Sequence, residues 1–316
     1  MLNAPFLICA LGVALSTGAA TAQTFPTKPV RIVTSEPGGA NDIAARLIAP
    51  GLSSTLGQQV LIDNRPAGVI PGQIVSKAAP DGHTLLITTS LLWILPLMQA
   101  TPFDPARDFT PVILVASQPN ILVTHPSLPV KAVHELIALA KARPGELDYA
   151  SGALGSSSHL AAELFKSMAD VSMVRVPYRG AGPAVLGLIS GQAQVLFGSA
   201  SSVRPHIPSR LRALAVTSPG RSTVFPELPT IAESGVSGYQ TVTPLVMFAP
   251  AATPAAIVTR LNSEIVQILK QNEVKERFLA SGVEVVASSS AELGAMMKAD
   301  VARMSKVIKA AGIRAE

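Results

Sequence analysis

Two adjacent glycines, Gly38 and Gly39, directly precede a helical pattern in the sequence. The residues before them, KPVRIVTS, alternate and are rich in β-branched side chains, as a β-strand would be. Apolar residues recur at helical spacing after them, and Asn41 and Asp42 are residue types that cap helix N-termini. In such a turn the free backbone N–H groups and the helix dipole favour an anion. Neither G-x-G-x-x-G nor G-x-x-x-x-G-K-[ST] occurs, so we expect a small anion and not a nucleotide.

Glycine- and serine-rich turns follow three further strand patterns in the middle of the chain. ELDYAS leads into GALGSSS, SMVRVPY leads into RGAGP, and AQVLF leads into GSASS. In open α/β sheets ligands bind at the carboxyl ends of strands, so these turns are candidate ligand contacts. Ser156 or Ser157 would donate a hydroxyl to the anion, beside backbone N–H groups. The predicted ligand-binding residues are Pro37, Gly38, Gly39, Ala40, Asn41, Asp42, Ser90, Gly152, Gly155, Ser156, Ser157, His159, Tyr178, Arg179, Gly180, Ala181, Gly198 and Ser199.

For two side chains in these turns, those of Arg179 and His159, the sequence is compatible with either of two roles. Arg179 can pair with a carboxylate through two hydrogen bonds, or it can be a solvated surface arginine. His159 is counted with the ligand contacts, although a capping or structural role is favoured over direct contact. The adjacency of Ser158 and His159 does not make a catalytic triad, and no G-x-S-x-G motif is present. We therefore do not expect nucleophilic catalysis.

Histidine spacing and charge argue against several other kinds of site. His83, His125, His134, His159 and His206 are never spaced as H-x-x-x-H, so we expect neither a metal nor another cofactor. The chain has 25 Lys and Arg against 20 Asp and Glu, which gives a net charge of +5. The basic residues are scattered and are not interleaved with aromatic residues, so nucleic-acid binding is not expected.

The N-terminus has the pattern of a secretory signal peptide. PFLICALGVALSTGAATAQ is a short apolar run followed by small residues, and Ala20-Thr21-Ala22 matches an A-x-A cleavage site. The run is shorter than the ~20 apolar residues that span a bilayer, which disfavours a membrane anchor. Cleavage after Ala22 would remove Cys9, the only cysteine, and with it any disulfide, Cys-ligated metal or thiol nucleophile. We expect a periplasmic location.

Strand and helix patterns alternate along most of the chain, which predicts an α/β fold with mainly parallel sheets. FTPVILVA and ILVTHPS are predicted as two separate strands. The first helix pattern contains Pro50, which should kink or shorten that helix. Thr253 and Pro254 are the expected start of a C-terminal helix, and Ser289 and Glu292 have capping-box spacing ahead of the last one.

Eight segments follow one another along nearly all of the chain after the signal pattern: FPTKPVRIVTSEPGGANDIAARLIA, LGQQVLIDNRPAG, VSKAAPDGHTLL, FDPARDFTPV, YASGALGSSSHLAAELF, VPYRGAGPAVLGLISGQAQVLF, LRALAVTS and FPELPTIAESG. In this order they resemble the solute receptors of tripartite tricarboxylate transporters, also called Bug receptors. The resemblance implies a two-domain periplasmic-binding-protein fold of type II, a flytrap with the ligand cleft between the domains. It also implies a non-enzymatic, extracytoplasmic monomer that delivers a carboxylate-bearing solute to two membrane subunits of the transporter.

The resemblance places the domain boundaries at two crossings of the chain. We expect a signal peptide over 1–22, one domain formed by 23–118 plus 237–316, and a second domain formed by 119–236. Ligand contacts to both domains would close the cleft by a hinge movement. The residues leave two other functions open: a periplasmic sensor that binds the same solutes for signalling, and a secreted α/β hydrolase, which is disfavoured.

Two departures from the family pattern bear on the ligand. Many relatives have an aromatic or small residue where Glu36 stands, and an acidic-amide pair where Gly198 and Ser199 stand. Gly198 supplies no carboxylate to balance an ammonium group, so we expect a small organic acid, either a dicarboxylate or an aromatic acid, over an amino acid. Glu36 could fill that missing role if its side chain turned into the cleft.

Overall fold

The computed structural model describes residues 25–35, 37–66, 68–152, 154–207, 209–310 and 312–313. The signal-peptide pattern and Glu36 therefore lie outside the described residues. Within these ranges the strands form one hydrogen-bonded array of ten, and they are β1 (Val30–Thr34), β2 (Val60–Asn64), β3 (Thr84–Thr88), β4 (Phe109–Thr124), β5 (Asp148–Ser151), β6 (Val174–Pro177), β7 (Val195–Ser199), β8 (Arg212–Val216), β9 (Val242–Pro250) and β10 (Glu284–Val285).

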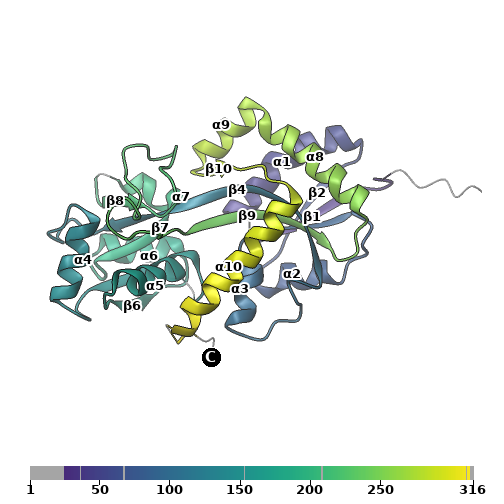
Figure 1. Cartoon of the computed structure of the whole chain (residues 1–316). Helices are drawn as coiled ribbons and strands as arrows, with labels where there is room; N and C mark the ends of the chain where they lie inside the picture. The colour runs from purple at the N-terminus through teal and green to yellow at the C-terminus, as the bar shows by residue number, and fades with distance from the viewer. Residues whose placement is uncertain are drawn as a thin grey trace, which may run out of the picture.

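Helices cover both ends of this array (Figure 1). They are α1 (Ala40–Leu56), α2 (Val69–Ser76), α3 (Leu91–Ile94), α4 (Val133–Ala142), α5 (Ser157–Ala169), α6 (Ala181–Ile189), α7 (Ala200–Val203), α8 (Ala255–Lys270), α9 (Asn272–Ala280) and α10 (Ser290–Ala310), with the 3-10 turns η1 (Leu95–Leu97) and η2 (Arg204–His206). No described helix is both long enough and apolar enough to cross a membrane.

The array is a mixed sheet, so the α/β prediction is confirmed but its mainly parallel character is wrong. Its strand order is β2-β1-β3-β9-β4-β7-β5-β6, with β8 and β10 also paired to β4. Two parallel groups lie at its ends, β2-β1-β3 and β7-β5-β6. Between them, β4 and β9 run antiparallel to each other and to their outer neighbours. The antiparallel middle arises because β4 carries the chain from one group to the other and β9 carries it back.

β4 is one continuous strand of 16 residues, so the prediction of two separate strands is wrong. Its first part pairs with β9 as far as Pro119, and its last part pairs with β7 from Asn120 onward. The Pro-Asn pair is typical of a turn, which is why the sequence pattern appears to break there. Proline fits an extended strand where its missing N–H is not needed, and here it lies at the change of partner.

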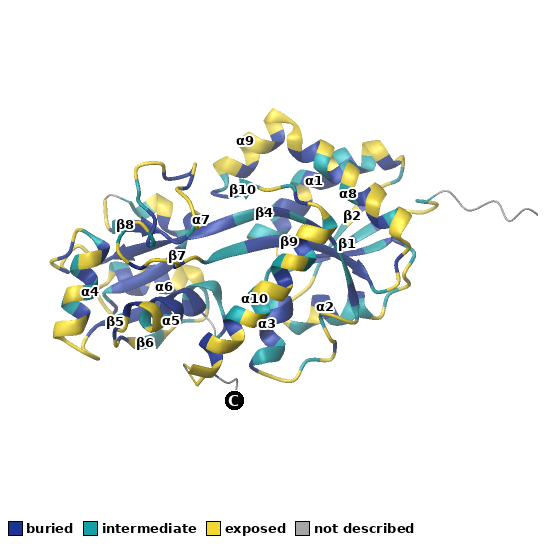
Figure 2. Ribbon diagram, in the orientation of Figure 1, coloured by how far each residue is buried: buried dark blue, intermediate teal, exposed yellow. Residues whose placement is uncertain are grey.

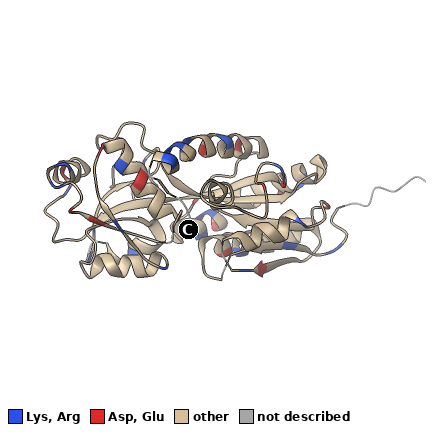
Figure 3. Ribbon diagram, turned by 90° about the horizontal axis from the view of Figure 1, so that it is seen from below, with Lys and Arg blue, Asp and Glu red and all other residues tan. Residues whose placement is uncertain are grey.

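The molecule has the two-domain, type II architecture, with β4 and β9 as the ribbon between the domains (Figure 1). We call the part around β1–β3 the first domain and the part around β5–β7 the second domain. The ribbon is largely buried, whereas α4, α8 and α9 expose their outer faces (Figure 2). Lysine and arginine residues are interspersed with aspartate and glutamate residues along the outer helices (Figure 3).

α10 crosses the ribbon diagonally (Figure 1). Near its start, Ser290 Oγ donates to the carbonyl of Pro111 at 2.7 Å. In its second half, Arg303 donates to the carbonyl of Gln240 at 2.6 Å and pairs with Asp300 at 2.6 Å. Between α10 and the start of β9 lies a cavity of about 240 Å³, lined by Pro219, Gln240, Thr241, Val242, Pro244, Met296, Ala299, Asp300 and Arg303.

Two further contacts join the domains near the ribbon. Glu284 of β10 accepts hydrogen bonds from Ser222 Oγ at 2.5 Å and from the Thr223 N–H at 2.9 Å. Gln118 of β4 donates its side-chain amide to Ser201 Oγ at 2.7 Å. Ser222 and Thr223 follow β8 in the second domain, whereas β10 pairs with β4 on the first-domain side. The Glu284 contact is therefore a clasp between domains.

Three predicted helix details have mixed outcomes. α1 continues through Pro50 to Leu56, so the helix is not shortened. α8 begins at Ala255 with Pro254 as its N-cap, so Thr253 is not the cap. The Thr253 hydroxyl donates to the carbonyl of Pro250 instead. The capping box is confirmed: the Ser289 N–H donates to the Glu292 carboxylate at 2.8 Å, and the Glu292 N–H donates to Ser289 Oγ at 3.2 Å.

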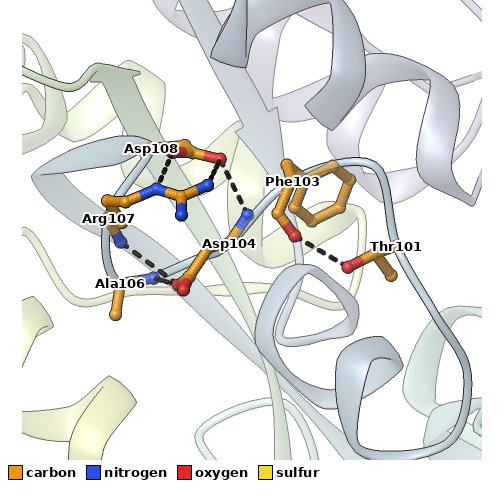
Figure 4. A network of polar contacts seen from close by, with 6 residues as sticks. All are labelled: Thr101, Phe103, Asp104, Ala106, Arg107 and Asp108. Carbon is orange, nitrogen blue, oxygen red and sulfur yellow. Dashed lines mark hydrogen bonds and ion pairs between the residues drawn. The ribbon is translucent and has the colours of Figure 1, made fainter.

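The segment FDPARDF is a local scaffold at the entrance to β4 (Figure 4). Asp104 Oδ1 accepts the N–H groups of Ala106 and Arg107 at 2.9 and 3.2 Å. Asp108 accepts the Asp104 N–H at 2.8 Å and pairs with Arg107 at 2.8 Å. These bonds within one turn hold the chain as it enters the ribbon, so the motif serves the fold.

Candidate functional site

Three turns of the second domain enclose a cavity of about 220 Å³. They follow β5, β6 and β7, which are parallel, so their carboxyl ends meet at one edge of the sheet. Of the residues predicted from the sequence, Gly152, Ser156, Ser157, Arg179, Gly180, Ala181, Gly198 and Ser199 line this cavity. The remaining lining residues, which the sequence reasoning missed, are Ser158, Ala184, Leu196 and Ser202.

The start of α5 brings a cluster of polar groups to the cavity. Ser156 is the N-cap of this helix, and its Oγ accepts the N–H of His159 at 3.4 Å. Ser158 Oγ accepts the N–H of Gly152 at 3.0 Å and lies 3.1 Å from Ser156 Oγ. A Cβ atom at Gly152 would lie 3.2 Å from Ser156 Oγ, so glycine leaves room for this serine pair.

His159 has a structural position beneath the cavity. It is 3% exposed, and its Nδ1 accepts the N–H of Gly155 at 3.1 Å. Burial, together with the nearby positive charge of Arg175, lowers the pKa of His159 to about 4. The ring is therefore neutral at neutral pH and brings no positive charge to a bound anion.

Arg175, which the sequence reasoning did not single out, fixes the turn after β5. Its Nε donates to Ser151 Oγ at 2.7 Å, and its guanidinium also donates to the carbonyl of Gly152 at 2.9 Å. The carbonyl of Ser151 accepts the N–H of Tyr178 at 2.8 Å. Both peptide groups flanking Gly152 are thus held by β6 and the residue that follows it.

Three predicted residues have packing roles in this arrangement. Gly155 has a φ of +74°, and a side chain there would collide with Met98 of the first domain. Tyr178 packs its ring over Gly187 of α6. Position 198 has no space for a side chain because Val203 of α7 lies against it. Gly198 still lines the cavity, but Gly155 and Tyr178 do not.

The glycine turn of the first domain is organised by Asp42. Its carboxylate, which is 3% exposed, accepts the Gly38 N–H at 2.9 Å, Arg46 Nε at 2.9 Å and Asn64 Nδ2 at 2.8 Å. Burial by itself raises the pKa of Asp42, but the hydrogen bonds from Arg46, Gly38 and Asn64 bring it below its usual value. Gly38 has a φ of +81°, which favours glycine.

The cap predicted for this turn is wrong in its position. α1 begins at Ala40 with Gly39 as its N-cap, so Asn41 and Asp42 lie inside the first turn of the helix. Asp42 reaches back to Gly38 because the glycine pair turns the chain before the helix starts. The Asp42 and Asn41 N–H groups belong to the first helical turn, which has no intrahelical acceptors for them.

Two buried polar atoms beside this turn lack a hydrogen-bond partner among the described residues. They are Asn41 Oδ1 and Thr34 Oγ1, although the Asn41 amide nitrogen donates to Ser35 Oγ at 3.2 Å. Ser90 follows β3 and is the N-cap position of α3, without a side-chain cap bond. β1 and β3 are parallel, so Thr34 and Ser90 lie at the same edge of the first-domain sheet.

The ribbon contributes a polar floor beside the turns of the second domain. Gln118 lies opposite Thr243, and Asn120 lies opposite Ser199, so these four side chains share one face of the antiparallel array. Asn120 is fully buried and donates its amide to the carbonyl of Ser157 at 3.3 Å. Asn120 Oδ1 and Thr243 Oγ1 have no partner within the described part of the chain. Sequence reasoning missed this floor because it lies mid-strand and not in a turn.

The second-domain cavity favours a negatively charged ligand. Among the described residues that line it, Arg179 carries the only charge, and serine hydroxyls and backbone groups supply the other polar atoms. A guanidinium and hydroxyl or N–H donors all bond well to a carboxylate. Across the described ranges, no group of three or more His, Cys, Asp or Glu side chains is arranged to hold a metal ion.

Structural comparison places the chain among known binding proteins. Rpa4515 of R. palustris, solved with adipate, has a TM-score of 0.80 and 38% identity, with 92% of this chain and 99% of that chain covered. MatC from Rhodopseudomonas palustris, solved with bound malate, has a TM-score of 0.76 and 29% identity, with coverage of 90% and 100%.

Sequence comparison agrees with the structural one. BugT of Bordetella pertussis is 36% identical over 324 residues, which cover 99% of this chain and 99% of BugT. Residues 44–313 match the model of the tripartite tricarboxylate transporter family receptor. The fold, the placement of the turns and these matches agree, and the chain belongs to the tripartite tricarboxylate transporter receptor family, whose members are solute-binding receptors.

Proposed function

We propose that this protein is a periplasmic receptor that binds a small carboxylate and delivers it to a tripartite tricarboxylate-type membrane transporter. One observation carries the proposal: three turns at the carboxyl ends of parallel strands surround a cavity in which Arg179 is the charged side chain. Such donors stabilise a carboxylate, and the described residues that line the cavity include no acidic side chain to balance a cation. The protein binds and releases its solute unchanged, as a receptor and not as an enzyme.

The ligands of two solved relatives support this choice of solute. Adipate accompanies Rpa4515, and malate is bound to MatC. Both are dicarboxylates of four to six carbons. In this chain, the cavity of about 220 Å³ also has the apolar side chains of Ala184 and Leu196 in its wall. A short carbon chain beside a carboxylate would suit this lining.

An amino acid is a poorer candidate because its ammonium group would lack a free carboxylate. Asp42 is the buried carboxylate of the first-domain turn, and it already accepts three hydrogen bonds. An acidic side chain at position 198 would collide with Val203. Glu36 lies outside the described residues, so its variant belongs in the experiment below.

We assign the contacts to both domains, with the turn 37–42 and Ser90 on one side and the turns after β5, β6 and β7 on the other. The proposed domains are 23–118 plus 237–316, and 119–236. The change of partner along β4 at Pro119 and Asn120 supports the first boundary. Ligand bonds to both domains would favour the closed arrangement, since only that arrangement makes all of them.

The test is a thermal-shift screen followed by titration calorimetry. The panel contains adipate, malate, succinate and benzoate, their amides, and aspartate and glutamate. A hydrogen bond to a charged group contributes about 1.5–3 kcal/mol, so exchanging the recognised carboxylate for an amide should weaken binding roughly 10- to 100-fold. Equal affinity for an acid and its amide would refute the carboxylate assignment. A preference for aspartate or glutamate that Glu36→Gln abolishes would show an amino-acid receptor.

Further measurements separate the remaining functions. Turnover of an ester panel that is lost in Ser156→Ala or Ser158→Ala would establish a hydrolase. Uptake of the labelled acid by cells that contain the two membrane subunits should depend on this protein. Uptake that is unchanged without the protein, together with a transcriptional response that requires it, would identify a sensor. The N-terminal sequence of the exported protein should begin at Gln23.

A further inference from the structure

Ser156 and Ser158 form a coupled hydroxyl pair in the wall of the second-domain cavity. Both residues line the cavity, and their Oγ atoms are 3.1 Å apart. Each oxygen also accepts one backbone N–H: Ser158 Oγ accepts that of Gly152 and Ser156 Oγ accepts that of His159. The pair therefore has fixed donors on both sides.

A count of protons and lone pairs limits what this pair can offer to a ligand. A serine hydroxyl has one proton to donate and two lone pairs that accept. If Ser158 donates to Ser156, both lone pairs of Ser156 Oγ are filled, because His159 occupies the other one. The Ser156 oxygen can then interact with a ligand only as a donor. The opposite direction would leave Ser158 as the donor.

The backbone bonds favour the direction from Ser158 to Ser156. The N–H of Gly152 lies 3.0 Å from Ser158 Oγ, whereas that of His159 lies 3.4 Å from Ser156 Oγ. Accepting the stronger bond makes the Ser158 proton the better donor, since hydrogen bonds in a chain polarise one another. The peptide that carries the Gly152 N–H cannot rotate freely, because its carbonyl, that of Ser151, is held by the Tyr178 N–H at 2.8 Å.

We propose that Ser158 is a positioning residue, which orients the Ser156 hydroxyl so that its proton points at the bound carboxylate. The chain of donors runs from the Gly152 N–H to Ser158, then to Ser156, and then to the ligand. This inference rests on the proposed function, because it concerns the same cavity and the same kind of ligand. Its consequence is selectivity: the Ser156 oxygen rejects ligand groups that must donate, such as an amide N–H.

The effects of substitution should be coupled and not additive. Ser156→Ala removes the terminal donor and should raise the Kd for the preferred acid about 10- to 50-fold. Ser158→Ala frees a lone pair on Ser156 and removes the polarising bond, so it should raise that Kd about 5-fold and narrow the preference for acid over amide. Once Ser156 is alanine, Ser158 has nothing to orient. The double variant should therefore bind within about 2-fold of Ser156→Ala.

The experiment measures the Kd values of wild type, the two single variants and the double variant by calorimetry. Each protein is titrated with the acid from adipate, malate, succinate and benzoate that wild type binds best, and with its amide. Ser158→Thr keeps the hydroxyl and should restore both the affinity and the acid preference. Ser167→Ala, at an exposed position of the same helix, is the matched control and should leave both unchanged. Melting curves without ligand show whether each variant is folded.

Two outcomes would overturn the proposal. Fold-changes of Ser156→Ala and Ser158→Ala that multiply in the double variant would show two independent contacts. A loss of affinity in Ser158→Ala with an unchanged ratio of acid to amide would show a purely structural role. If wild type binds none of the four acids, the proposed function fails first. If wild type prefers the acid and only the coupling is missing, the positioning role alone fails.

Discussion

Replacing Asp42 by alanine should loosen the glycine turn of the first domain and destabilise that domain. The buried carboxylate accepts three hydrogen bonds, from the Gly38 N–H, Asn64 and Arg46. The Arg46 side chain is 55% exposed, so it can turn to water at little cost. The Gly38 N–H would lose its acceptor, whereas Asn64 would keep its bond to the carbonyl of Ser35 at 2.7 Å and the bond that it accepts from Arg46 at 3.2 Å.

The magnitude follows from the bonds of Gly38 and Asn64 to the carboxylate; Gly38 is exposed and Asn64 is half-buried, so the low end of the usual range applies to each. Each hydrogen bond to a charged group contributes about 1.5–3 kcal/mol, so Asp42→Ala should lower the free energy of unfolding by about 3 kcal/mol. For a domain of this size, that loss corresponds to a Tm lower by about 6–12 °C. Arg46→Ala removes only the exposed partner and should leave the free energy of unfolding nearly unchanged.

The assay is urea denaturation and a thermal melt of wild type, Asp42→Ala and the control Arg46→Ala at pH 7. The pKa of Asp42 in the folded state lies below its usual 3.8, so its contribution is complete at neutral pH. That contribution is lost as the pH falls below about 3.8, where the gap between wild type and Asp42→Ala should narrow. An Asp42→Ala protein as stable as Arg46→Ala at pH 7 would refute the account of the turn.

Three other predictions concern pH, the clasp and the packing of α7. The pKa of His159 is about 4 in the folded protein against 6.5 in the unfolded chain, so the free energy of unfolding should rise by about 3 kcal/mol between pH 4 and pH 6.5. Urea titrations of wild type and His159→Gln over this pH range would test this. Equal slopes of unfolding free energy against pH in the two proteins would contradict it. Glu284→Ala removes the clasp to Ser222 and Thr223 and should raise the ligand Kd about 10-fold. Glu276→Ala, at an exposed position of α9, is the control. An unchanged Kd in Glu284→Ala would show that the clasp persists when the cleft opens. Gly198→Ala places a Cβ against Val203 and should cost about 1–3 kcal/mol in a thermal melt, whereas Gly220→Ala, in open space, should cost little.

The part of the site that sequence could predict is the part that lies in turns. Glycine and serine runs after strand patterns are local signals, and the carboxyl ends of parallel strands bring such runs together. For this reason Ser156, Gly180 and Ser199, which are distant in the chain, were predicted together and line one cavity. The capping box at Ser289 and Glu292 was predictable for the same reason, since its bonds span one helical turn.

The missed features depend on contacts that no local pattern contains. In the sequence, the segment from Gln118 to Asn120 resembles a break between two strands. The role of Gln118 and Asn120 as a polar floor arises only from the partners of β4 on either side of Pro119. Tyr178 follows a strand as a ligand contact would, but its ring packs over Gly187, where a glycine leaves a depression in α6. The bond from the Gly152 N–H to Ser158 Oγ joins the two ends of a turn, so the sequence around Ser158 and His159 gives no sign of it.

The ribbon of β4 and β9 presents a different surface on each of its two faces. Val242 and Pro244 face the space of about 240 Å³ beneath α10, whereas Thr243, between them, faces the polar floor with Gln118. A bulkier side chain at Ala299, which also lines that space, would therefore press on the ribbon from the face opposite Gln118 and Thr243.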